Sequence, residues 1–358
     1  MSTGNNLLDL TTKMNEYIFN ASGSSKYSYL INHLSGIVSR NSIYESPMTD
    51  NGYVFFGKPK LNLYSSSLKQ DRILSALNTL SPESLAFAIR CYLDPKFANR
   101  SDISKIAQNC ELYNTETPYI PVLTNQLESL SGWATPTMET ETTEGGFFSE
   151  NITIAKGHND LNKTITLSAT FNELVGFPIT NIFMMWFRFI HLTTRGIVKP
   201  HNKYIEEYKV FYGFPIYRFV LDVSGKYIEI WSKGTLCFPN DYPIVDKLDF
   251  NKENTRKIHN KVTVSITVNF SEYMDIAILS DFNTWVKRAC PSIEEYQPLT
   301  DEQKKYFLHY AIPYINFQHG TKELEWRVNP NEIDLTSPLD KINNIIDEIK
   351  QYINEEPL

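Results

Sequence analysis

Two side chains, His201 and Cys237, are of the types that could form a nucleophilic catalytic pair. Such a pair works when the fold brings the imidazole within hydrogen-bond reach of the thiol, so that a thiolate forms. Nothing in the spacing indicates that contact, and Cys237 lies between Leu236 and Phe238, a setting typical of a small core residue. A hydrolase that uses Cys237 or a pair of carboxylates is therefore the functional class that the sequence favours least.

The chain has no catalytic or cofactor motif that would point to an enzyme. It contains no P-loop, no G-x-G-x-x-G, no H-E-x-x-H and no G-x-S-x-G. Its cysteines are widely spaced without a C-x-x-C pair, which argues against a zinc site or disulfide framework and favours buried thiols in a reducing compartment. They are Cys91, Cys110, Cys237 and Cys290. We therefore predict no enzyme activity, no cofactor and no metal.

An acidic stretch, residues 137–146, is the more informative cluster of charge. In an extended conformation Glu139 and Glu141 lie on one face, Glu144 follows them, and two glycines provide a turn. One interpretation is a solvated acidic loop, since charged runs are usually exposed. The other is an acidic lining, repeated around a ring, that repels a polyanion and lets it slide without sticking. The sequence leaves both interpretations open.

Composition excludes several classes of protein. With 358 residues, of which 42% are hydrophobic and 13% aromatic, the chain can bury a large core and is not a disordered protein. Its 34 basic and 41 acidic residues give a net charge of -7 without any run of Lys or Arg, so binding to nucleic acid by phosphate neutralisation is not expected. The most apolar block, residues 182–192, is too short to span a bilayer, and the first 17 residues show no secretory signal. We expect no membrane anchor.

Three stretches alternate apolar residues with Thr, Ser, Ala or Asn: residues 151–156, 164–171 and 262–270. This period of two predicts strands with one face in a core and the other facing water or a polar surface. The predicted core faces include Ile152, Ile154 and Phe270. The opposite faces are rich in uncharged hydroxyl groups, which suits contact with other protein or the lining of a channel.

The remaining patterns predict three regions. Residues 1–115 are predicted to be mainly helical, 116–290 to form a β domain, and 291–358 to be a helical C-terminal extension. Within the β domain we expect a helix over residues 183–190, a hairpin that turns at residues 223–226, and a helix over residues 276–288.

The C-terminal region carries two helix-start signals. Thr300 and Gln303 have the spacing of a capping box. A later helix, which begins near Pro338, places a row of isoleucines on one face and needs a partner surface. We predict that this row and four aromatic residues of the β domain contact neighbouring subunits. The candidates are Phe147, Phe148, Tyr212, Phe214, Ile342, Ile346 and Ile349.

The order of these elements resembles a known family. Two strands are followed by an apolar helix with a Trp, by a hairpin that carries Tyr-Arg-Phe-Val-Leu-Asp at residues 217–222, and by Gly-Thr-Leu-Cys-Phe-Pro at residues 234–239. A last alternating strand ends in Val-Asn-Phe at residues 268–270. From Pro136 to Trp285 this order resembles the tail tube proteins of contractile-tailed bacteriophages, especially the baseplate proteins that initiate the tube.

The resemblance implies an α+β fold with an antiparallel β-barrel or sandwich and a flanking helix. It implies a virion structural protein, made in the host cytoplasm, that forms a homo-oligomeric, hexameric ring at the baseplate or tube end, contacts other tail proteins, and nucleates or caps the tube. DNA would pass through the ring during ejection without sequence-specific binding. Glu139, Glu141 and Glu144 would then face the lumen. Plain tube subunits are shorter, so the two terminal regions depart from them.

A different class remains open as the alternative. A β-sandwich that binds carbohydrate would use exposed aromatic rings to stack on sugars, and Trp133 and Trp231 are the candidates for that role. Sugar binding that is lost on their substitution would favour this class, because a structural protein of a phage tail tube is expected to bind no sugar.

Overall fold

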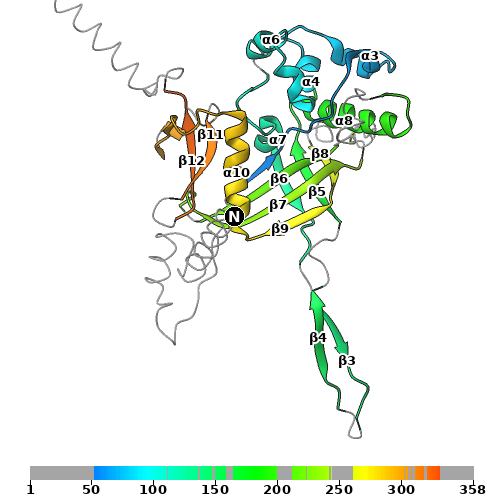
Figure 1. Cartoon of the computed structure of the whole chain (residues 1–358), viewed down its shortest axis with the longest axis vertical. Coiled ribbons are helices and arrows are strands. Elements are labelled where there is room, and N and C mark those ends of the chain that lie inside the picture. The colour runs from blue at the N-terminus through cyan, green and yellow to red at the C-terminus, as the bar shows by residue number, and fades with distance from the viewer. Residues whose placement is uncertain are drawn as a thin grey trace, which may run out of the picture. The chain divides into compact units, whose positions relative to one another are not determined.

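A computed structural model covers the chain (Figure 1). It describes residues 52–110, 112–135, 138–146, 150–158, 164–199, 212–222, 224–241, 243, 261–301, 303–304, 308, 311–317 and 321–330. The chain divides into two compact units. The larger unit comprises Asp50–Val220 and Ile230–Ile278, and the smaller unit comprises Met1–Thr49, Leu221–Glu229 and Leu279–Leu358.

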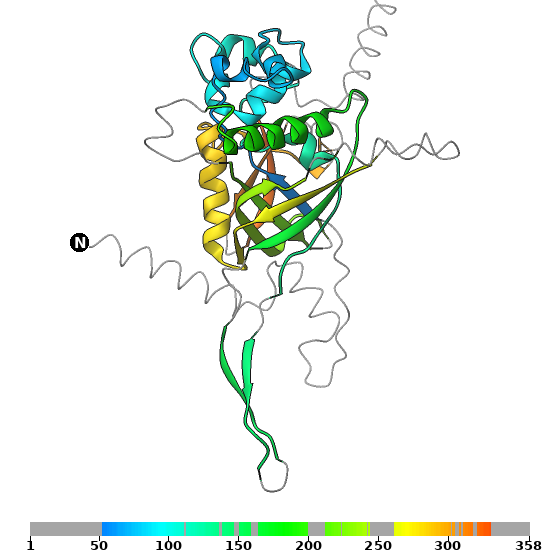
Figure 2. The same cartoon turned by 90° about the vertical axis from the view of Figure 1, so that its right-hand side faces the viewer.

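A seven-stranded sheet forms the centre of the larger unit. The strand order is β1 (Gly52–Phe56), β6 (Phe214–Leu221), β7 (Ile228–Pro239), β8 (Lys261–Val268), β5 (Ile165–Asn172) and β2 (Leu127–Ser131), and β9 (Phe270–Tyr273) also pairs with β7. Figure 2 shows the central strands side by side. Among the described residues β1 and β2 end the path and do not pair with each other, so the antiparallel sheet is confirmed but closure into a barrel is not seen.

Strands β5 and β8 bear out the predicted alternation. In β5 the residues Ile165, Leu167, Ala169 and Phe171 are buried, and the hydroxyl-bearing residues between them are exposed or half-buried. The register places Thr170 opposite Thr263, and their hydroxyl oxygens lie 3.3 Å apart. A core face and a hydroxyl-rich face therefore run across both strands, as the sequence predicts.

The predicted core position of Phe270 is wrong, because the strand changes phase just before it. Strands β8 and β9 run antiparallel to β7 on either side of Asn269, whose side-chain amide donates to the carbonyl oxygen of Leu236 at 2.9 Å. Leu236 has a φ of 53°, in the left-handed region. Beyond this irregularity Phe270 is 46% exposed and Ser271 is buried.

The larger unit also contains short helices. They are α3 (Ser65–Leu68), η1 (Leu74–Asn78), α4 (Leu85–Leu93), α5 (Pro95–Ala98), α6 (Ser104–Gln108) and α7 (Pro121–Asn125). Their apolar residues join those of the sheet in one core. Arg90 of α4 is 1% exposed and its guanidinium donates to the carbonyl oxygen of Leu77 and to the hydroxyl of Ser65. These contacts fix the helices to one another.

Helix α8 (Pro178–Thr194) confirms the predicted apolar helix around residues 183–190. Phe183, Trp186 and Phe189 are buried by its inner face. Arg188 forms a bidentate ion pair with Asp71, with distances of 2.8 and 2.7 Å. In the part of the chain that the structure describes, no helix combines the length and apolar character needed to cross a membrane.

The smaller unit contains a three-stranded antiparallel sheet, in the order β10 (Gln297–Pro298), β12 (Glu323–Val328) and β11 (Ile312–Asn316). The helical C-terminal extension predicted for residues 291–358 therefore contains strands as well, and its predicted last helix lies outside the described residues. The sequence signal that reveals β12 is its alternation, in which Leu324, Trp326 and Val328 are buried and each follows a half-buried charged residue. The predicted helix over residues 276–288 is confirmed as α10 (Ile276–Ala289).

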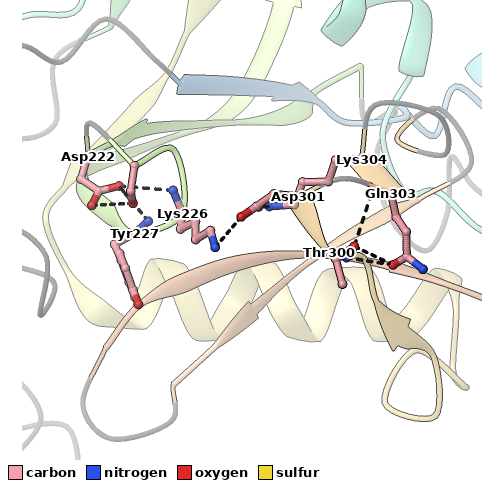
Figure 3. Close-up of polar contacts among 8 residues, drawn as sticks. Asp222, Lys226, Tyr227, Thr300, Asp301, Gln303 and Lys304 are labelled. Carbon is pink, nitrogen blue, oxygen red and sulfur yellow. Dashed lines mark hydrogen bonds and ion pairs between the residues drawn. The ribbon is translucent and has the colours of Figure 1, made fainter.

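A buried carboxylate shapes the turn of the β6–β7 hairpin, whose predicted position is confirmed. Asp222 is 2% exposed and accepts hydrogen bonds from the hydroxyl of Ser224 and from the backbone N–H groups of Lys226 and Tyr227 (Figure 3). Next to this turn, Tyr227 forms a bridge to Glu323 at the start of β12. The turn is thereby joined to the sheet of the smaller unit.

An ion-pair chain connects the same turn to the start of a helical turn. Lys226 Nζ lies 2.7 Å from a carboxylate oxygen of Asp301, which also pairs with Lys304 at 3.0 Å (Figure 3). The predicted capping box is confirmed: Thr300 N–H donates to Gln303 Oε1 at 3.0 Å, and Gln303 N–H donates to Thr300 Oγ1 at 3.3 Å. This polar cluster is structural, because its members satisfy one another.

Candidate assembly surface

Strands β3 (Met138–Thr142) and β4 (Thr153–His158) form a two-stranded antiparallel sheet that is separate from the seven-stranded one. All side chains of β3 are exposed, as are residues 150–156. The predicted strand at 151–156 is therefore confirmed as a strand, but its predicted core face is wrong. Ile152 and Ile154 are 62% and 57% exposed. Alternation defines two faces of a strand, and no other layer of the described chain covers either face here.

The register divides the hairpin into an apolar face and a hydroxyl face. Because directly opposite residues of an antiparallel pair point to the same side, Glu141 shares a face with its partner Ile154. Ile152 joins this face, and its backbone N–H donates to the hydroxyl of Thr143 at 3.0 Å. On the other face Thr142 lies opposite Thr153, with 3.2 Å between their hydroxyl oxygens.

The apolar face is costly to leave in water. Burying an isoleucine side chain is worth about 1.5–3 kcal/mol. A lone two-stranded hairpin is at best marginally stable in water. A second protein surface laid over Ile152 and Ile154 would therefore stabilise both the contact and the hairpin itself.

The predicted lumen-facing glutamates all belong to this hairpin. Glu139, Glu141 and Glu144 are exposed. Glu141 forms an exposed ion pair with Lys156 at 3.1 Å, which offsets part of the acidic charge. The structure thus groups the three carboxylates on one projecting element, and their role in lining a lumen stays a prediction.

The predicted subunit-interface residues lie in different settings. Phe214 is 1% exposed and its ring packs 4.7 Å from that of Trp186, so its side chain serves the core of the larger unit. Tyr212 is half-buried, and burial raises the pKa of its phenol. The remaining candidates lie outside the described residues: Phe147, Phe148, Ile342, Ile346 and Ile349. Contact with a neighbouring subunit stays a prediction for all of them.

The residues of the rival functions are placed unfavourably for those functions. Trp231 is 1% exposed and its indole N–H donates to the carbonyl oxygen of Asp275 at 2.6 Å, so its ring has no free face for a sugar. Trp133 is half-buried against Tyr273. Cys237 is fully buried, and burial raises the pKa of its thiol, which opposes formation of a thiolate. His201 lies outside the described residues, and all four cysteines are buried and form no disulfide, as predicted.

A second exposed apolar element, residues 174–177, was missed by sequence reasoning. Leu174, Val175 and Phe177 are 41%, 104% and 44% exposed. Phe177 has a φ of 55°, and the preceding Glu173 carboxylate accepts hydrogen bonds from backbone N–H groups at the start of α8. The loop is therefore held in shape. Its signal in the sequence is a set of apolar residues around a glycine directly before a proline.

Exposed apolar elements and an open sheet define a protein whose surface is suited to contact with other proteins. The family described as "Putative phage tail tube protein" matches residues 29–342, so the chain belongs to this family of phage tail proteins. This agrees with the resemblance found in the sequence. A comparison with curated protein sequences gives no match.

Several solved structures show weak similarity. The tube-terminating cap of the anti-feeding prophage is 9% identical over 42% of this chain and 80% of that chain, with a TM-score of 0.25. The sheath/tube terminator of an extracellular contractile injection system, PVC, in its extended state is 10% identical. That match covers 41% of this chain and 84% of that chain, with a TM-score of 0.24. A chain of the PVC sheath-tube complex in its extended state is 9% identical, and the match covers 42% of this chain and 80% of that chain with a TM-score of 0.23. At such TM-scores these similarities carry no argument about function.

Proposed function

We propose that the protein is a structural subunit of a contractile phage tail that forms a ring at the baseplate or tube end and assembles through its β3–β4 hairpin. The observation that carries the proposal is the exposure of Ile152 and Ile154 on a separate hairpin, in a chain of the tail tube family. Another subunit would cover the face that carries these isoleucines and Glu141, and Glu139 and Glu144 would lie near the channel.

The open sheet supports assembly into a ring. Strands β1 and β2 end the path of the seven-stranded sheet, and backbone groups at a sheet edge can pair with a strand of another molecule. A ring of identical subunits, hexameric as the resemblance implies, would complete the sheet into a barrel around the DNA. Additional elements such as the three-stranded sheet of the smaller unit suit a subunit at a tube end, which must meet other tail proteins.

The test replaces the apolar face without changing the strand. The variant carries Ile152→Thr and Ile154→Thr, which keep β-branched side chains and lower the apolar area. The matched control carries Thr153→Ser and Ala155→Ser on the opposite face of the same strand. We expect wild type and control to form rings or short tubes in negative-stain images and in sedimentation velocity, and the Thr variant to remain monomeric with unchanged thermal unfolding.

Two different outcomes would count against the proposal. A wild-type protein that stays monomeric at every salt and protein concentration would contradict the role as a ring subunit. A Thr variant that assembles as readily as wild type would contradict the role of the hairpin face and leave ring formation to other surfaces.

A further inference from the structure

Residues 112–120, here named the strap, run from the end of α6 to α7, and the last three of them lie against the end of β1. The strap forms an antiparallel bridge between Tyr119 and Gly57. Lys58 N–H donates to the carbonyl oxygen of Pro118 at 3.0 Å, and Ile120 N–H donates to the carbonyl oxygen of Phe56 at 2.8 Å. Since β1 ends the seven-stranded sheet, the strap occupies backbone groups at and just beyond the end of that edge.

Two buried side chains from other elements hold the first half of the strap. Lys58 is 8% exposed, and its Nζ donates to the carbonyl oxygen of Asn114 at 2.6 Å. The hydroxyl of Tyr92 donates to the carbonyl oxygen of Leu112 at 2.6 Å. Lys58 Nζ also lies 4.4 Å from the ring centre of Tyr113. Among the described residues no carboxylate forms an ion pair with Lys58, which is unusual for a buried lysine.

The surroundings of Lys58 favour the uncharged amine. The titratable or charged groups of the adjoining segments are Arg90, Cys91 and Tyr92 of α4, Asp94 after it, Cys110 after α6, and Tyr113, Glu116 and Tyr119 of the strap. Burial raises the pKa of Cys91 to about 12 and also raises those of Tyr92 and Tyr113, so these groups are neutral near pH 7. Burial lowers the pKa of Lys58 to about 7, because the loss of water around an ammonium outweighs its hydrogen bond to Asn114 and its contacts with the rings of Tyr92 and Tyr113.

We propose that the strap is a releasable cover over the end of the β1 edge and that Lys58 is its lock, so that proton uptake by the Lys58 amine favours release. In the closed state the amine is out of water and holds Asn114. In the released state it meets water and regains its ordinary basicity. Release therefore takes up a proton at any pH at which Lys58 is protonated in the open state and unprotonated in the closed state.

The sign of the pH dependence follows from this linkage. The pKa of Lys58 is about 7 in the closed state and returns toward 10.5 in the open state. Between these values each lower pH unit raises the opening constant up to tenfold, and below pH 7 both states carry the proton and the dependence fades. From pH 9 to pH 7 the opening constant should rise about 50-fold.

Release would free the carbonyl oxygen of Phe56 and the N–H of Lys58 for a strand of another molecule. The inference depends on the contacts of the strap and not on the tail role. A failure of ring assembly would leave it standing.

The test is hydrogen exchange of the full chain between pH 6 and pH 9.5, read by mass spectrometry. The opening constant of each strap amide is obtained from its measured exchange rate and the intrinsic rate of an unstructured amide at the same pH, which removes the intrinsic pH dependence of exchange. We expect this opening constant to rise about 50-fold from pH 9 to pH 7 and then to level off.

Two variants assign the effect. Lys58→Met keeps an unbranched side chain and removes the titration, so the pH dependence should vanish. Tyr92→Phe removes the hydrogen bond to Leu112, so opening should increase at every pH with the slope retained. A wild-type strap whose opening constant does not change with pH across this range would overturn the proposal, even if Lys58→Met fails to fold. A pH dependence that persists in Lys58→Met would overturn it as well.

Discussion

Asn283 of α10 and Ile315 of β11 exchange two hydrogen bonds, so that a side-chain amide takes the place of a neighbouring strand. Asn283 Nδ2 donates to the carbonyl oxygen of Ile315 at 2.7 Å, and the N–H of Ile315 donates to Asn283 Oδ1 at 2.9 Å. Asn283 is 7% exposed, and β11 is an end strand of the three-stranded sheet. The pair satisfies backbone groups that would otherwise be buried without partners.

Replacing Asn283 by Leu should therefore lower the free energy of unfolding by about 1–3 kcal/mol, because both backbone groups of Ile315 lose their partner. Urea unfolding measures the change. The control is Thr284→Ala, an exposed position on the same helix, where a change within about 0.5 kcal/mol is expected. Equal effects of the two substitutions would show that the amide pair adds nothing specific.

The ion pair between Arg188 and Asp71 should make stability depend on acid pH. It lowers the pKa of Asp71 from 3.8 to about 2, and backbone N–H groups of Ile73 and Leu74 add to the effect. A lowered carboxyl pKa stabilises the fold above about pH 4, and this contribution is lost as the pH falls toward 2.

We expect Asp71→Asn to cost about 1–2 kcal/mol at pH 6, less than the full shift implies because Arg188 is partly in water. The difference from wild type should shrink toward zero near pH 2. Denaturant unfolding at a series of pH values measures both, and a difference that does not change with pH would contradict the assigned pKa.

Glu173 should stabilise the start of α8 through its carboxylate. Its oxygens accept hydrogen bonds from the N–H groups of Ile179 at 3.1 Å and Thr180 at 3.0 Å, and from the Thr180 hydroxyl. The positive end of the helix dipole adds to this. Glu173→Ala should cost about 1–2 kcal/mol in thermal or urea unfolding. The stability of Glu173→Gln, which keeps an acceptor but loses the charge, should fall between that of wild type and that of Glu173→Ala.

Replacing Glu139 and Glu144 by Lys should leave assembly largely intact and slow the passage of DNA. Both side chains are exposed, so folding should change little. Glu141 is kept, because it shares the face of Ile154 that another subunit would cover. Lysines at a lumen would bind phosphates and release counterions. Ejection kinetics of assembled particles provide the measurement, and wild-type kinetics would remove the lumen assignment.

Local signals of the sequence predicted local structure well. The capping box of Thr300 and Gln303 forms as expected, because its hydrogen bonds join residues three apart. The apolar helix α8, the β6–β7 hairpin and the alternation of β5 and β8 also follow the sequence, since period and turn chemistry act over a few residues.

The candidate site was predicted only in part. The sequence pattern singled out the glutamates of the hairpin, but it placed Ile152 and Ile154 in a core, and the apolar residues of the exposed loop at 174–177 were not recognised as a surface element. The same alternation is buried in β5 and exposed in β4, because a strand pattern states that two faces differ and says nothing about which layer covers them. The prediction that Phe270 lies in the core was wrong for a related reason, because the strand changes phase at Asn269.

The sequence by itself determined the periods, the caps, the turns and the absence of known catalytic motifs, because each depends on neighbours along the chain. Only the tertiary structure decided which apolar face stays uncovered and which distant groups meet. Lys58 reaches Asn114 across 56 positions, and Asn283 reaches Ile315 across 32. Such contacts depend on how the layers pack, and packing is a property of the whole chain rather than of any one segment.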